Sequence, residues 1–180
     1  IFLRIKEEYA PNTSLLITNE NCGGGEPTLT FVRDVTVSGS CVNKFTVTRT
    51  YRSTDVCGNS ATCTQVITVN DVTPPSITCP APITVSCSTD VPAPNTSLVI
   101  TSDNCGGGAP TVTFVSDVTV SGSCVNKFTV TRTYQSTDVC GNTATCTQVI
   151  TVNDVTAPSI TCPAPITVSC STDIPAPNTS

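Results

Sequence analysis

The residues with the clearest chemistry in this chain are its twelve cysteines, which occur without a single histidine. In a structural zinc site, neighbouring cysteine or histidine ligands are separated by only a few residues. The shortest spacings here, those of Cys57 with Cys63 and of Cys79 with Cys87, are too long for that pattern. Cysteines in this number are typical of a disulfide framework. Because disulfides form and persist in oxidising compartments, the sequence predicts an extracellular or cell-surface protein.

Catalytic chemistry has almost no candidate residues. Histidine, the most common general base, is absent, and a serine or threonine nucleophile requires a neighbouring base. No pattern in the sequence indicates such a base, so we predict that the protein is not an enzyme.

Three aspartates, Asp103, Asp138 and Asp154, are candidate metal ligands because they fall in predicted turns or linkers. Calcium prefers six to eight oxygen ligands, usually from several carboxylates that are close in sequence. These aspartates are isolated, and Asp103 and Asp138 can instead cap turns through their own backbone. We therefore expect no cofactor, with calcium as the alternative.

Three asparagines, Asn12, Asn95 and Asn178, each begin an Asn-x-Ser/Thr triplet. This triplet is the acceptor pattern for N-glycosylation in secreted proteins, and it also occurs frequently by chance. The three asparagines are therefore candidate modification sites.

The elements that position these residues recur at an interval of 83 positions. Segments 11–97 and 94–180 differ at only ten of 87 aligned positions, which indicates a tandem array whose repeat is the structural unit. We predict an incomplete unit over residues 1–72, which lacks its own opening strands, and a complete unit over residues 73–155. Residues 156–180 are then the opening strands of a further unit.

Within one unit, short runs of alternating residues are separated by glycine-containing turns, a pattern typical of antiparallel strands. Phe128, Val130 and Tyr134 share one face of such a strand, and Arg132 interrupts that face, which places it near a sheet edge. No segment has helical periodicity with helix caps. The sequence therefore predicts an all-β fold in which two sheets form a sandwich.

The order of motifs in the unit resembles that of the hyalin-repeat (HYR) family. The resemblance covers the whole 83-residue unit and is carried by Ile-Thr-Cys-Pro at residues 77–80, Asp-Asn at 103–104 and the Asp-x-x-Gly-Asn-x-x-x-Cys segment at 138–146. That family is an immunoglobulin-like module, common in tandem on extracellular and bacterial surface proteins and associated with adhesion. The resemblance implies tandem immunoglobulin-like sandwiches. The sequence departs from simpler family members by four further cysteines, Cys87, Cys105, Cys124 and Cys140.

The resemblance also implies one disulfide, Cys79–Cys146, between the first and last strands. The other four cysteines of the unit allow three pairings. We favour Cys87–Cys105 and Cys124–Cys140, because each closes a short loop between neighbouring strands. By translation, the second of these pairs predicts Cys41–Cys57 in the earlier copy.

The two ends of the chain complement each other. Cys22 and Cys63 have no predicted partners in the first copy, and Cys162 and Cys170 have none in residues 156–180. We predict that this C-terminal segment completes the incomplete unit of the next subunit through Cys162–Cys63 and Cys170–Cys22. The alternative is that these residues are a window of one long polypeptide, in which the same contacts form within a single chain. Both arrangements produce a linear fibre of self-associated units.

The charge and the lengths of the apolar runs argue against nucleic acid as a partner and against a membrane span. The net charge of −5 and the pI near 4.4 argue against nucleic acid, whose binders need a clustered basic surface. No apolar run approaches the length of a membrane span.

Two function classes remain. The first is a structural subunit of an extracellular filament or surface stalk, which near-identical copies favour because length or multivalency then matters. The alternative is an adhesin module that recognises a glycan or a surface protein, in a calcium-dependent manner or otherwise, through a loop such as residues 104–108.

Overall fold

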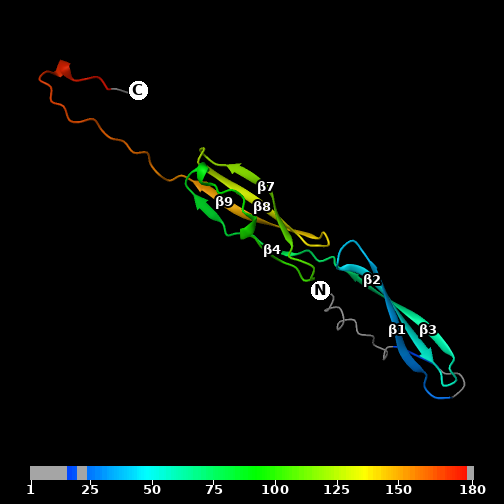
Figure 1. Ribbon diagram of the computed structural model, residues 1–180. Helices are drawn as coiled ribbons and strands as arrows, with labels where there is room; N and C mark the ends of the chain where they lie inside the picture. Colours follow the sequence, from blue (N-terminus) through cyan, green and yellow to red (C-terminus); the bar gives the residue numbers. More distant parts are fainter. Residues whose placement is uncertain (1–15, 20–23, 178–180) are drawn as a thin grey trace.

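The computed structural model describes residues 16–19 and 24–177, and in this part of the chain it confirms the predicted all-β fold (Figure 1). The strands are β1 (Thr28–Ser38), β2 (Lys44–Thr54), β3 (Ser60–Asn70), β4 (Ser76–Thr78), β5 (Ile83–Val85), β6 (Ile100–Ser102), β7 (Thr111–Ser121), β8 (Lys127–Thr137) and β9 (Thr143–Asn153). Single turns of 3-10 helix occur at η2 (Ser88–Asp90), η3 (Thr96–Leu98) and η4 (Ser171–Asp173). Among the described residues, no helix is long and apolar enough to cross a membrane.

The second unit, which contains β4 to β9, is a two-sheet sandwich. One sheet has the order β5-β9-β8-β7, and the other pairs β4 with β6. β4 packs against β8 and β9 of the larger sheet. β5 runs parallel to β9, with Ile83 opposite Ile150 and Val85 opposite Val152, whereas β7 and β9 flank β8 in antiparallel register. This arrangement is consistent with an immunoglobulin-like sandwich.

The core of the second unit is formed by the alternating residues of β8 and β9. Val130 and Tyr134 on β8 are buried, and so are Ile150 and Val152 on β9. The Phe114 ring meets Tyr134 edge to face, with centroids 6.4 Å apart. Burial of β-branched side chains on one strand face supplies most of the apolar contact, since aromatic residues make up only 4% of the chain.

Arg132 occupies this core, and its predicted position near a sheet edge is wrong. It lies on β8, a central strand, and is only 2% exposed. Its guanidinium donates two hydrogen bonds to the Asp117 carboxylate, at 2.9 and 2.8 Å, and a third to the Pro92 carbonyl at 2.8 Å. A buried charge is tolerated when it is paired and fully hydrogen-bonded, so the partners of Arg132 explain its central place.

The first unit, which contains β1, β2 and β3, has a single three-stranded sheet in the described part of the chain. Its strands begin and end 83 residues before β7, β8 and β9, and Arg49 pairs with Asp34 as Arg132 pairs with Asp117. The face of this sheet is only partly covered. Val47 and Ile67 are half-buried, whereas the equivalent Val130 and Ile150 are fully buried.

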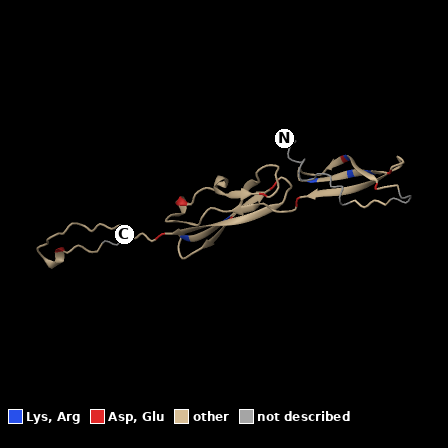
Figure 2. Ribbon diagram, turned by 90° about the horizontal axis from the view of Figure 1, so that it is seen from below, with Lys and Arg blue, Asp and Glu red and all other residues tan. Residues whose placement is uncertain are grey.

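The C-terminal segment, residues 156–177, contains no strand and extends away from the second unit (Figure 1). Its apolar side chains are uncovered: Ile160 is 90% exposed and Ile174 is 67% exposed. The charged residues of the two units are scattered, and Figure 2 shows no continuous basic stripe along the ribbon.

The unequal burial of equivalent residues leads to the first prediction. Replacing Ile150 by Ala should lower the free energy of unfolding of the second unit by about 3 kcal/mol, because it removes a fully buried side chain. Ile67→Ala is the matched variant, and we expect a clearly smaller loss in the first unit. Hydrogen–deuterium exchange of β8 and β2 measures both effects, and equal losses would contradict the difference in packing.

Candidate functional site: the junction between the two units

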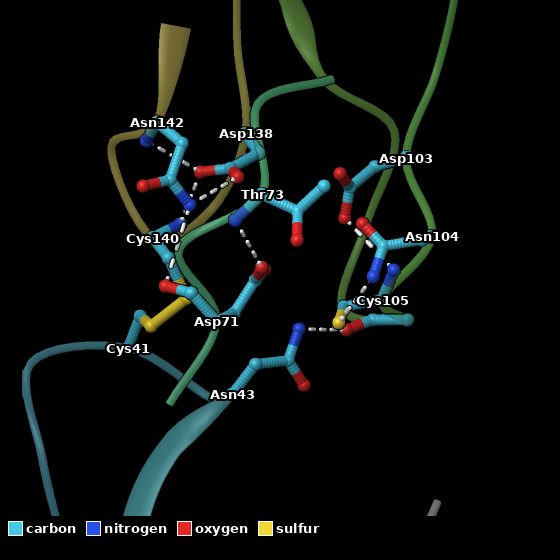
Figure 3. The surroundings of a disulfide bond; sticks show 11 residues. Cys41, Asn43, Asp71, Thr73, Asp103, Asn104, Cys105, Asp138, Cys140 and Asn142 are labelled. Carbon is cyan, nitrogen blue, oxygen red and sulfur yellow. Dashed lines mark hydrogen bonds between the residues drawn. A yellow bond between two sulfur atoms is a disulfide. The ribbon is translucent and has the colours of Figure 1, made fainter. Parts of the chain in front are cut away.

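A disulfide between Cys41 and Cys140 crosses the junction between the two units (Figure 3). Cys41 lies in the turn between β1 and β2, and Cys140 lies in the turn between β8 and β9. Their Cα atoms are 5.1 Å apart although 99 positions separate them in sequence. The two units, which lie end to end in Figure 1, are therefore joined covalently at two places, by the backbone and by this bond.

This disulfide corrects two predicted pairs, Cys41–Cys57 and Cys124–Cys140. In each pair, one cysteine precedes a strand of 11 residues and the other follows it. At ~3.3 Å per residue, such a strand separates its two turns by roughly 35 Å, whereas disulfide-bonded Cα atoms lie within about 7 Å. The loops are short in sequence, but their ends lie at opposite ends of the sandwich.

The predicted pair Cys87–Cys105 is also absent, for a similar reason. Cys87 precedes η2, where the Ser88 amide donates to the Asn126 side chain in the turn between β7 and β8. Cys105 follows β6 and lies at the junction, at the other end of the unit. Neither cysteine forms a disulfide within the described residues.

The structure joins Cys79 to Cys146, the pair that the resemblance implied, with Cα atoms 5.6 Å apart. This bond links the end of β4 to β9 and so fastens the small sheet to the large one. Five further cysteines of the described chain are exposed and form no disulfide: Cys57, Cys63, Cys124, Cys162 and Cys170. Cys22 lies outside the described residues, so its pairing stays a prediction.

The loop that follows β6 packs directly on the first unit. The Asn43 side-chain amide donates a hydrogen bond to the Gly106 carbonyl. Gly107 has a φ of +140°, and a Cβ atom there would lie 2.6 Å from Val42 and 3.2 Å from Val139. Only glycine fits this conformation and this close approach. Residues 104–108, considered from sequence as a ligand loop, therefore form part of the contact between units.

Asp138 shapes the turn that carries Cys140. Its carboxylate accepts hydrogen bonds from the backbone amides of Cys140 and Asn142, at 2.8 and 2.9 Å, and from the Asn142 side chain at 2.8 Å. Burial opposes the charged form, but these donors outweigh it and lower the pKa of Asp138. Asp138 therefore caps its turn, as the sequence also suggested, and holds Cys140 toward the first unit.

A cavity of about 400 Å³ lies at the junction and is lined by residues of both units, Asp71 and Cys105 among them. Residues 71–75, between β3 and β4, form the linker between the two units. Figure 3 shows Asp71 and Thr73 of this linker on one side, and Asp103, Asn104 and Cys105 on the other. Three atoms lie within 4.8 Å of one another: one carboxylate oxygen of Asp71, one carboxylate oxygen of Asp103 and the sulfur of Cys105. Sequence reasoning selected Asp103 and missed Asp71, although the repeat interval makes Asp71 the equivalent of the candidate Asp154.

The remaining candidates lie apart from this junction. Asp154 accepts a hydrogen bond from the Thr156 amide at 2.8 Å, at the far end of the second unit. Asn95 is exposed at the start of η3, where its side chain accepts from the Ser97 amide and hydroxyl. Asn12 and Asn178 lie outside the described residues.

The sandwich, with a disulfide between its first and last strands, defines the second unit as an immunoglobulin-like module. Residues 75–152 match the model of the HYR-like domain with 4 cysteines, so this segment belongs to the HYR-like family and the resemblance is confirmed. That family consists of extracellular, non-enzymatic modules. The matched segment carries six cysteines, two more than the description of the family. No curated protein matches the chain.

The tight packing of Gly107 leads to the second prediction. Gly107→Ala should weaken the junction by roughly 1–3 kcal/mol, because the new methyl group would overlap Val42. Dithiothreitol should then reduce Cys41–Cys140 faster, which alkylation and mass spectrometry can follow. Gly106→Ala is the control, since nothing lies within 4 Å of a Cβ atom there. Equal reduction rates in the two variants would show that the loop does not hold the junction.

Proposed function

We propose that this chain is a load-bearing segment of an extracellular filament or surface stalk, in which consecutive HYR-like units are joined covalently. The observation that carries this proposal is the Cys41–Cys140 disulfide, which connects the end of one unit to the facing end of the next. A ligand-binding module needs no covalent bond to its neighbour. A stalk benefits from one, because the bond resists separation and bending of the units under force.

The position of the disulfide determines how the chain carries load. Force applied along the backbone reaches Cys41 and passes through the sulfur bridge to Cys140, so the intervening residues bear little tension. This enclosed stretch contains β2, β3, the linker and β4 to β8, whereas β9 lies outside it. All strands of the sandwich except β9 are thereby shielded from the force that the fibre transmits.

The repeat supplies the same bond at further junctions. Cys124 is the equivalent of Cys41, and Cys57 is the equivalent of Cys140. Both are exposed and form no disulfide in the described part of the chain, and they lie at opposite ends of the two-unit array. A following unit would bond to Cys124 and a preceding unit to Cys57, which extends the array in both directions.

Strand complementation is the second element of the proposal. In the second unit, β5 pairs with β9 and Cys79 bonds to Cys146. Translation by the repeat interval pairs residues 166–168 with residues 67–69, and Cys162 with Cys63. The partly covered sheet of the first unit and the exposed apolar residues of the C-terminal segment support this contact, made by an adjoining unit in cis or by another chain.

The proposal does not extend to Cys170–Cys22. These residues are the equivalents of Cys87 and Cys105, which lie at opposite ends of the second unit. The adhesin alternative is not favoured by residues 104–108 either, since Gly106 and Gly107 contact the first unit. A glycan or a surface protein stays a candidate partner for the filament as a whole.

Single-molecule stretching of the full chain tests the load-bearing role. Reduction should lengthen the fully extended chain by roughly 340 Å, because it releases the 99 positions enclosed by Cys41–Cys140. Cys41→Ser should give a smaller gain, since Cys79–Cys146 still encloses 67 positions. Cys79→Ser is the control and should leave the oxidised length unchanged. The proposal fails if oxidised and reduced chains extend equally.

Oxidative assembly tests the repeated bond. Full-length chain oxidised at high concentration should form disulfide-linked oligomers that contain Cys124–Cys57 and Cys162–Cys63 peptides, identified by mass spectrometry without reduction. Combining Cys57→Ser with Cys63→Ser should abolish these oligomers, whereas Cys87→Ser should not affect them. Random pairing among the exposed cysteines would overturn the proposed ladder.

A further inference from the structure

We propose that the junction binds one calcium ion between the two units, with Asp71 of the linker and Asp103 of the second unit as its anionic ligands. The inference rests on the junction that the proposed function also uses, but it adds a ligand to that function. It assigns to the junction an ionic connection in addition to the backbone and the disulfide.

The first evidence is a pair of carboxylate oxygens without partners. Asp71 is 5% exposed, and its Oδ1 accepts a hydrogen bond from the Thr73 amide at 3.1 Å. Its Oδ2 is buried and has no hydrogen-bond partner among the described residues. Asp103 repeats this pattern, because Oδ2 accepts from the Cys105 amide at 3.0 Å while Oδ1 is buried without a partner. Both free oxygens belong to residues that meet at the junction.

The second evidence is uncompensated negative charge. The ion pairs of the described chain join Arg49 to Asp34 and Arg132 to Asp117, and neither involves Asp71 or Asp103. No lysine or arginine lines the cavity. An unpaired buried carboxylate is strongly unfavourable, and a cation between two of them would remove that penalty.

The surrounding groups favour a hard cation that prefers oxygen. The cavity is lined by Asp71 and by four residues with oxygen-bearing side chains, Asn43, Asn70, Thr73 and Asn104. One carboxylate oxygen of Asp103 lies within 4.8 Å of one of Asp71. Calcium takes six to eight such oxygens in flexible geometry, and water can complete the set in a cavity of about 400 Å³. Cys105 is the single thiol in the cluster with Asp71 and Asp103, whereas a structural zinc site takes four cysteine or histidine ligands.

The equivalent position in the second unit shows that two units are needed. Asp154 has the same local hydrogen bonds as Asp71. The Asp154 amide donates to the Asn126 carbonyl at 3.0 Å, and the Asp71 amide donates to the Asn43 carbonyl at 3.0 Å. Asp154 is nevertheless only half-buried. The linker therefore presents one half of the site, and the loop after β6 of the following unit supplies the other half.

Calorimetric titration of calcium chloride into the monomeric full chain tests this site. We expect one calcium ion to bind per chain. Asp71→Asn and Asp103→Asn should each lower the calcium affinity at least about tenfold, because even substitutions next to the direct ligands of a metal cause a loss of that size. Calcium should also raise the melting temperature of the unsubstituted chain but not of these variants. Asp154→Asn is the matched control and should bind normally. Cys105→Ser should bind as well, because the thiol is not a ligand.

Three outcomes would overturn the proposal: no calcium binding, equal loss in Asp154→Asn, or tight zinc binding that Cys105→Ser abolishes. Disulfide mapping of each variant keeps the two proposals distinguishable. If Cys41–Cys140 forms in Asp71→Asn while calcium binding is lost, the folded junction is intact and the site is assigned. If the disulfide forms and the unsubstituted chain binds no calcium, only the calcium site fails and the covalent stalk stands.

Discussion

The length of the strands is the constraint on which the junction depends. Strands of 11 residues place successive turns of a meander at opposite ends of the sheet. A cysteine in one turn cannot reach the cysteine in the next, so its partner must come from the unit that faces it. The bond between Cys41 and Cys140 follows from this geometry. The Asp138 turn and the Gly107 loop shape the end of the second unit that faces the first.

The disulfides also explain how a thin core is sufficient. Few aromatic residues are present, so the second unit relies on β-branched side chains, the Cys79–Cys146 bond and the buried Arg132–Asp117 pair. Disulfides restrict the unfolded chain and therefore stabilise a fold without additional apolar burial. A bond within the unit fastens its two sheets together, while a bond between units limits their relative motion.

Sequence reasoning predicted the strands and the disulfide that the family resemblance implied, and failed for contacts between parts of the chain that are distant in sequence. Alternation of residues predicted the strands, and the family resemblance implied Cys79–Cys146. The partner of Cys41 could not be found from loop length, because the relevant distance lies across a junction that no local pattern describes. Arg132 was placed at an edge because its charge suggested exposure, whereas Asp117 and Pro92 compensate that charge in the core. Asp71 was missed because it is buried only by the following unit.

The contacts at the junction explain why the two copies are nearly identical in sequence. A unit that joins neighbours at both ends must carry both halves of every contact, so Cys41 and Asp71 recur as Cys124 and Asp154. Most differences between the copies fall elsewhere, as at Arg52 and Gln135 on the strands. Where a junction residue does differ, Asp103 corresponds to Glu20. The carboxylate is kept although the side chain changes length, which is the chemistry that a shared cation would require.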